Sequence, residues 1–147
     1  MQWARKATGS AVVITNPAGE VLLVRRAYPP GDWVLPGGNA EARESPVETA
    51  LREVREETGL HIELERMTGV YYQEDHPAGE FIHFVFAAAI GQDAEVQTDS
   101  EEIADYRFFA ADHLPEPMSA STRERVLDGL APEPLALPVT LLPRAEW

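Results

Sequence analysis

The chain has 147 residues, 44% of them hydrophobic, and its 12 basic and 25 acidic side chains give a formal net charge of −13. This size and composition predict one domain with a single apolar core. The acidic excess argues against a nucleic-acid polymer or an anionic membrane surface as partner, because both require an excess of Lys and Arg. The absence of cysteine excludes disulfides and thiolate metal sites. We expect a cytoplasmic protein, since the sequence shows neither a signal-peptide pattern nor an apolar stretch of bilayer length.

The first part of the chain predicts a β-hairpin followed by a loop. Two apolar runs, residues 11–15 and 21–26, are separated by an Asn-Pro-Ala-Gly segment that favours a turn. The next stretch, residues 28–38, is punctuated by Pro and Gly and predicts an ordered loop in which Trp33 and Leu35 anchor to the core.

A helix is predicted from Pro46 to Thr58. Ser45 is a suitable N-cap, Pro46 suits the first helical position, Glu48 completes a capping box and Gly59 stands where a C-terminal cap belongs. A helical wheel predicts that the buried face consists of Val47, Ala50, Leu51, Val54 and Thr58.

The rest of the chain predicts three more strands and a second helix. Residues 61–75 and 80–91 have strand character, and an acidic loop leads to a short strand at residues 106–109. Residues 119–131 predict a helix with Val126, Leu127 and Leu130 at helical spacing, and the last segment, residues 131–147, has too many prolines for a regular element. Together these elements predict an α/β fold, an α/β/α sandwich around a mixed β-sheet. We expect a single domain over residues 1–147, with a C-terminal helix and proline-rich tail in 116–147.

Six glutamates and three arginines are concentrated between Gly37 and Leu60. Three of these glutamates, Glu53, Glu56 and Glu57, fall on one arc of the predicted helix. An ordinary solvated face is one interpretation. However, they lie in the second half of the helix, where the helix dipole disfavours negative charge. A divalent cation would turn their repulsion into binding, and oxygen-only ligands indicate Mg²⁺ or Mn²⁺.

The spacing of this segment resembles the signature box of the Nudix hydrolases. Gly38, five residues, Glu44, seven residues and then the run from Arg52 to Leu60 match that pattern without departure. The lead-in "GDWVLPGG" and the later "EEIADYRFFAADHLP" also resemble the family.

The resemblance implies a role for each residue of the box and for a few outside it. Metal ligands would be Glu53, Glu56, Glu57, a main-chain carbonyl of Gly37, and Glu102 from the downstream acidic loop. Of these, Glu53, Glu57 and Glu102 would be catalytic, with Glu101 as the alternative to Glu102. Arg52 and Glu44 would form a structural ion pair. Arg25 and Arg26 end a predicted strand near this site, and one of them, with Arg26 preferred, is a candidate contact for phosphate; Trp33 either stacks on a nucleobase or belongs to the core.

The implied function is a Mg²⁺-dependent hydrolase, a Nudix pyrophosphohydrolase that cleaves the pyrophosphate bond of a nucleoside diphosphate linked to a group X. ADP-ribose or another nucleotide sugar and a (d)NTP are the candidate small-molecule substrates. The alternative is a non-catalytic module that binds or senses a nucleotide. The apolar stretch "PLALPVTLL" near the C-terminus either covers the core or contributes to a homodimer.

Overall fold

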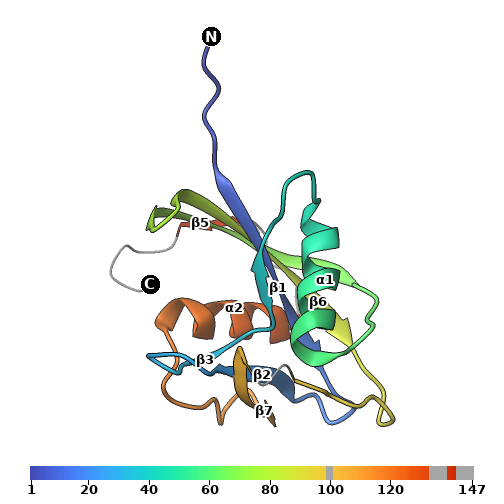
Figure 1. Cartoon of the computed structure of the whole chain (residues 1–147). Coiled ribbons are helices and arrows are strands. Elements are labelled where there is room, and N and C mark those ends of the chain that lie inside the picture. Colours follow the sequence, from blue (N-terminus) through green and yellow to red (C-terminus); the bar gives the residue numbers. More distant parts are fainter. Residues whose placement is uncertain (99–100, 133–138, 142–147) are drawn as a thin grey trace.

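The computed structural model describes residues 1–98, 101–132 and 139–141. Figure 1 shows one mixed sheet system with two helices packed on it. In chain order the elements are β1 (Ala7–Thr15), β2 (Val21–Arg26), β3 (Trp33–Val34), β4 (Gly37–Asn39), α1 (Pro46–Thr58), β5 (Arg66–His76), β6 (Gly79–Ala89), β7 (Ile103–Phe109), α2 (Ala120–Leu130) and β8 (Val139–Leu141).

The sheet is mixed, as the sequence predicts. Its strand order is β3-β2-β1-β6-β5-β8, with β4 also paired to β1 and β7 to β2. The pairs β1–β6 and β5–β8 are parallel and the others are antiparallel. The predicted hairpin is present, with Thr15 opposite Val21 in the register. The α/β class and the sandwich architecture are therefore confirmed.

The two faces of β1 belong to two separate apolar clusters, because successive side chains of a strand point to opposite faces. Val12 and Ile14 pack with Ala50 and Val54 of α1. Val13, one position along, packs in a cluster that includes residues of β2, β5, β6 and α2. The helices accordingly cover opposite sides of the central strands, as Figure 1 shows.

Helix α1 begins and ends where its capping residues predict. The Ser45 side chain accepts a hydrogen bond from the Glu48 N–H, and Gly59 closes the helix in the left-handed conformation at φ 70°. Glycine adopts that conformation without steric cost. These local signals determine both ends of the element.

The predicted buried face of α1 is partly wrong. The buried residues are Thr49, Ala50, Val54 and Thr58, whereas Val47 is 45% exposed and Leu51 is 37% exposed. Thr49 is fixed inside by hydrogen bonds from its hydroxyl to Glu44 and to the Ser45 carbonyl. Ala50, Val54 and Thr58 of the predicted face are buried, whereas Val47 and Leu51 lie at the surface.

Several other expectations need correction. The expected loop at residues 28–38 contains the short strand β3 and the start of β4, and the strand expected from residue 61 begins only at Arg66. In α2, Val126 is buried and Leu130 packs against the same core, but Leu127 is 44% exposed. The C-terminal segment contains one regular element, β8, which pairs in parallel with β5 because β6 occupies only one edge of that strand. The remaining tail, residues 133–138 and 142–147, lies outside the described residues.

Candidate active site

A cavity of about 620 Å³ lies between the sheet, α1 and α2. This volume is within the usual range for ligand sites. Residues from seven strands, β1 to β7, both helices and the intervening loops line it. The lining includes the carboxylates Glu53, Glu57 and Glu102, the Gly37-Gly38 pair and Arg26. The structure thus brings most of the predicted site residues to one cavity.

The two glycines of β4 allow three groups to approach closely. A Cβ on Gly37 would lie 2.2 Å from the Ser10 carbonyl oxygen, so only glycine lets β4 pack against β1 here. A Cβ on Gly38 would lie 2.5 Å from the carboxyl carbon of Glu53. The Gly37 N–H donates a hydrogen bond to Glu57 Oε2 at 3.1 Å. The glycine pair therefore makes room for one catalytic candidate and binds another.

Burial changes the ionisation of the two helix carboxylates. It raises the pKa of Glu57 to about 8, an effect that the Gly37 hydrogen bond opposes and that repulsion from Glu53 and Glu102 reinforces. Burial also raises the pKa of Glu53, while its contact with Arg52 opposes the change. The main cause is thus loss of solvation, with mutual repulsion second. In the metal-free protein Glu57 therefore holds a proton at neutral pH.

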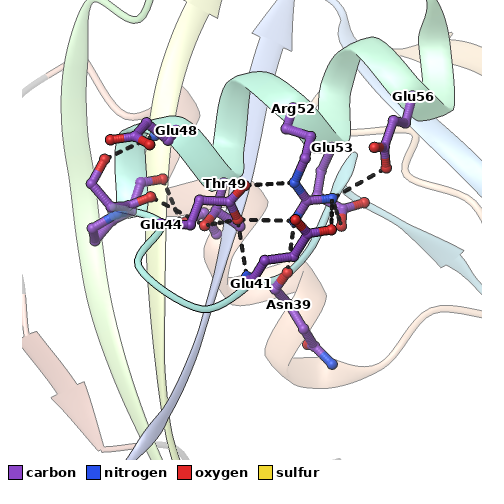
Figure 2. A network of polar contacts seen from close by, with 11 residues as sticks. Asn39, Glu41, Glu44, Glu48, Thr49, Arg52, Glu53 and Glu56 are labelled. Atoms are coloured by element: carbon purple, nitrogen blue, oxygen red, sulfur yellow. Dashed lines mark hydrogen bonds and ion pairs between the residues drawn. The ribbon is translucent and has the colours of Figure 1, made fainter.

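Arg52 organises the acidic segment (Figure 2). Its guanidinium donates to Glu44 at 2.6 and 2.9 Å, to Glu53 at 2.9 Å and to Glu56 at 3.2 Å, and it also binds the Asn39 carbonyl at 3.0 Å. These bonds connect α1 to the loop that follows β4. The hydrogen bonds from Arg52 lower the pKa of Glu44 to about 2. The geometry agrees with the structural ion pair that the Nudix resemblance implies.

The chemistry of the donors suits a divalent cation, because buried carboxylates that raise one another's pKa gain from a nearby positive charge. In the described part of the chain, no three His, Cys, Asp or Glu side chains are gathered closely enough to hold a metal ion. The reason is that Glu53 turns toward Arg52 and Glu57 toward the Gly37 N–H. Glu56 is 55% exposed, binds Arg52 and does not line the cavity. Its role as a ligand stays a prediction.

Glu102 and Arg26 lie on the cavity wall outside the helix. Glu102 lines the cavity and acts electrostatically on both helix carboxylates, while Glu101 is not part of the lining. The Ala27 N–H binds the Glu102 carbonyl at 2.8 Å, which ties this loop to the end of β2. Arg26 lies close enough to Glu57 to lower the pKa of that carboxyl group, and Arg26 Nε is 3.6 Å from Asp32 Oδ1. Both residues thus line the same cavity as Glu53 and Glu57, and their chemical roles stay predictions.

Trp33 does not present its ring to the cavity. It is 6% exposed, packs edge to face against Phe109 with ring centroids 5.2 Å apart, and is absent from the cavity lining. The prediction of base stacking by Trp33 is therefore wrong and the core interpretation is right. The ring is large and apolar, and the core between α2 and β2 accommodates it fully.

The cavity extends beyond the carboxylates to residues that the sequence does not single out. These are Gln73, His76, Phe81, His83, Ser121, Thr122 and Arg125, from β5, β6 and α2. The strand alternation offers one signal for them. Gln73 stands two positions after Tyr71 and therefore shares its inward face, where a polar residue is unusual.

The comparisons with known proteins agree with this geometry. Residues 5–130 match the family model of the NUDIX domain. A putative 8-oxo-dGTP diphosphatase of Bacillus subtilis is 32% identical over 120 residues, which cover 82% of this chain and 77% of that protein. An ADP-ribose pyrophosphatase of Methanocaldococcus jannaschii is 36% identical over 106 residues, covering 69% of this chain and 61% of that protein. The crystal structure of a MutT NUDIX hydrolase from Burkholderia pseudomallei aligns with a TM-score of 0.71 at 27% identity, over 85% of this chain and 98% of that one.

The fold and the carboxylate-lined cavity thus define a hydrolase of the α/β sandwich type, and the chain belongs to the Nudix family. It is a Nudix pyrophosphohydrolase, and enzymes of this family generally use divalent metal ions. No helix among the described residues is long and apolar enough to cross a membrane.

Proposed function

We propose that this Nudix hydrolase cleaves the pyrophosphate bond of a nucleoside diphosphate linked to a group X, and that it uses Mg²⁺. One observation carries the proposal: Glu53, Glu57 and Glu102, from two separate elements, converge on one cavity that also contains Arg26. When bound, Mg²⁺ would offset the negative charge of the pyrophosphate oxygens and lower the pKa of the attacking water. Mn²⁺ fits the same oxygen donors.

The carboxylates have different proposed roles. Glu53 and Glu57 would hold the cation, which binds the ionised carboxylate, whereas burial favours the protonated form of Glu57. Glu56 and the Gly37 carbonyl are further proposed ligands. Glu102 stands on the loop before β7, where it accepts the proton of the attacking water or adds a ligand. A loop residue can approach and withdraw, which a helix residue cannot do.

The basic residues orient rather than react. Arg26 donates to the phosphate oxygens, since it is the arginine on the cavity wall beside Glu57. Arg52 and Glu44 position the helix carboxylates through the network of Figure 2. Neither Arg52 nor Glu44 needs to touch the substrate.

The substrate is a small nucleotide. The two relatives named above act, by their names, on 8-oxo-dGTP and on ADP-ribose, which share a nucleoside diphosphate and differ in what it carries. ADP-ribose or another nucleotide sugar and a (d)NTP are therefore the candidates for this chain. A single domain over residues 1–147, a cytoplasmic location and homodimer formation stay predictions from the sequence.

The deciding experiment is a substrate panel assayed with Mg²⁺ and with Mn²⁺. ADP-ribose, NADH, nucleotide sugars and (d)NTPs are incubated with wild type, Glu57→Gln and Glu48→Gln, and the released mononucleotide is quantified. We expect metal-dependent release by wild type, a loss of kcat by orders of magnitude in Glu57→Gln, and a near wild-type rate in Glu48→Gln, whose side chain is exposed at the start of α1. Tight nucleotide binding without turnover would instead support the non-catalytic module, and equal losses in both variants would remove the assigned role of Glu57.

A further inference from the structure

The hairpin formed by β2 and β3 holds Arg26 and Asp32 opposite each other at one wall of the cavity. The register pairs Arg25 with Trp33. Arg26 and Asp32 are therefore the next opposite pair, and the Arg26 N–H donates a hydrogen bond to the Asp32 carbonyl at 3.1 Å. Opposite residues of an antiparallel pair have their side chains on the same face. The backbone thus places these two side chains next to each other, and both line the cavity.

One oxygen of Asp32 is buried without a hydrogen bond. Asp32 Oδ1 has no hydrogen-bond partner among the described residues, although the side chain as a whole is 17% exposed. Burying such an oxygen costs free energy, because it loses its hydration without replacement. Arg26 Nε lies 3.6 Å from this oxygen. A buried oxygen cannot contact a ligand, so Asp32 Oδ1 can act on one only through its neighbour Arg26.

A small movement would turn this ion pair into a hydrogen bond. Charge-assisted N–H···O bonds measure about 2.7–2.9 Å between heavy atoms, so the guanidinium would have to shift by roughly 0.7 Å. The Arg26 side chain is 39% exposed, and tight packing therefore does not oppose the shift. The completed bond would occupy Nε and fix the plane of the guanidinium.

The two terminal nitrogens of Arg26 stay available to a ligand. Within the part of the chain that the structure describes, its only polar side-chain contact is the one between Nε and Asp32. The guanidinium carbon lies 5.9 Å from the centroid of the Tyr28 ring, which also lines the cavity. Arg26 is close enough to Glu57 to act on its charge, so the guanidinium lies near the proposed cation site. Two parallel N–H donors match two oxygens of a phosphate.

The preceding arginine has a different role. Arg25 Nε donates to the Gly31 carbonyl at 2.9 Å, and Arg25 is not among the residues that line the cavity. Arg25 therefore stabilises the turn of the hairpin. Of the two arginines, Arg26 is the one that a ligand in the cavity can contact.

We propose that Asp32 is a positioning residue for phosphate binding: it accepts a hydrogen bond from Arg26 Nε when a diphosphate binds, and so presents the terminal nitrogens of Arg26 to the phosphate oxygens. This inference rests on the proposed function, which assigns Arg26 to the phosphate. The negative charge of Asp32 would by itself repel a diphosphate. Removing Asp32 will therefore weaken binding only if the orientation of Arg26 outweighs this repulsion, which gives the test its sign.

The test is a double-mutant cycle on the binding of imidodiphosphate, a diphosphate analogue without a base, in the presence of Mg²⁺. Calorimetry measures the dissociation constant for wild type, Arg26→Ala, Asp32→Ala and the double variant. We expect binding at least about tenfold weaker in Arg26→Ala, about fivefold weaker in Asp32→Ala, and no weaker in the double variant than in Arg26→Ala. Asp32→Asn keeps an oxygen acceptor for Nε and should bind within about threefold of wild type.

Two more variants serve as control and as second test. Asp105→Ala is the matched control, because Asp105 forms its own ion pair with Arg107 at 3.2 Å and neither residue lines the cavity. This variant should bind the analogue as wild type does. Arg26→Lys covers the case in which Asp32→Ala does not fold, which its melting curve would show. Lysine keeps the charge but lacks the Nε–H and the planar fork, so we expect a loss of about tenfold.

Four results would overturn the proposal: unchanged or tighter binding in Asp32→Ala, a loss from Asp32→Ala that persists when Arg26 is already Ala, undiminished binding in Arg26→Lys, or no binding of the analogue by wild type. Binding of imidodiphosphate requires no hydrolysis. A wild type that binds the analogue and shows the expected cycle, but cleaves nothing in the substrate panel, would refute the proposed reaction and support the role of Asp32.

Discussion

Replacing Glu57 by Gln should make the metal-free protein more stable while it abolishes turnover. The side chain is held inside by the Gly37 N–H, and a glutamine oxygen can accept the same hydrogen bond. The difference is the charge. Because burial raises the pKa of Glu57 in the fold, ionising this residue costs free energy that the neutral glutamine does not cost.

The sign and size of the effect follow from the two pKa values. A group with a raised pKa in the fold contributes its stability below the unfolded pKa and loses it as the pH rises through the folded pKa. For Glu57 these values are 4.5 and about 8. At about 1.4 kcal/mol per pKa unit, the metal-free wild type should lose roughly 3 kcal/mol of unfolding free energy between about pH 5 and pH 8 through this one group. The variant should not show this loss.

Urea denaturation in EDTA at a series of pH values measures the difference directly, with Glu48→Gln as the control for removing an exposed glutamate. Mg²⁺ binds the ionised form, so it should restore the stability of wild type at about pH 8 and raise its melting temperature more than that of Glu57→Gln. If wild type and Glu57→Gln lost stability in parallel as the pH rose, Glu57 would not hold a proton in the fold and the reasoning would be refuted.

Two further predictions concern other acidic residues. Glu102→Gln should lower kcat at least about tenfold, with little change in the Mg²⁺ concentration that gives the half-maximal rate. Glu101→Gln should lower kcat only slightly. The opposite ranking of the two variants in steady-state assays would transfer the role to Glu101. Because Arg52 lowers the pKa of Glu44 from 4.5 to about 2, this pair contributes stability above pH 4.5 that is lost as the pH falls toward 2. Glu44→Gln should therefore be less stable than wild type at neutral pH and show a smaller decline on acidification, and equal acid titrations followed by circular dichroism would contradict this.

The ends of α1 could be predicted from the sequence because they depend on neighbours in the chain. Ser45, Pro46 and Gly59 specify both ends through hydrogen bonds and backbone angles within a few residues. Which face is buried depends on contacts from elsewhere. The helical wheel placed Val47 and Leu51 inside because they are apolar, but both are exposed, and Ala50 and Val54 pack instead on Val12 and Ile14 of β1.

The helix carboxylates and the Gly37-Gly38 pair could be predicted because they stand close together in the sequence, within the segment that resembles the Nudix box. The part of the cavity beyond them could not, since β5, β6 and α2 contribute residues that meet only in the folded chain. Strand β8 was missed for the same reason. Its pairing depends on the second edge of β5. In that pairing Val139 lies opposite Val70, which stands some 70 positions earlier in the chain.

Arg52 acts as a resident counter-ion within the acidic segment. It already places one positive charge among four carboxylates, those of Glu41, Glu44, Glu53 and Glu56, at 2.6 to 3.8 Å. A monovalent ion such as Na⁺ or K⁺ would bring no more charge than the guanidinium supplies, and it would have to compete with formed hydrogen bonds for Glu53. A divalent ion brings twice that charge. We therefore expect this acidic segment to favour divalent over monovalent cations.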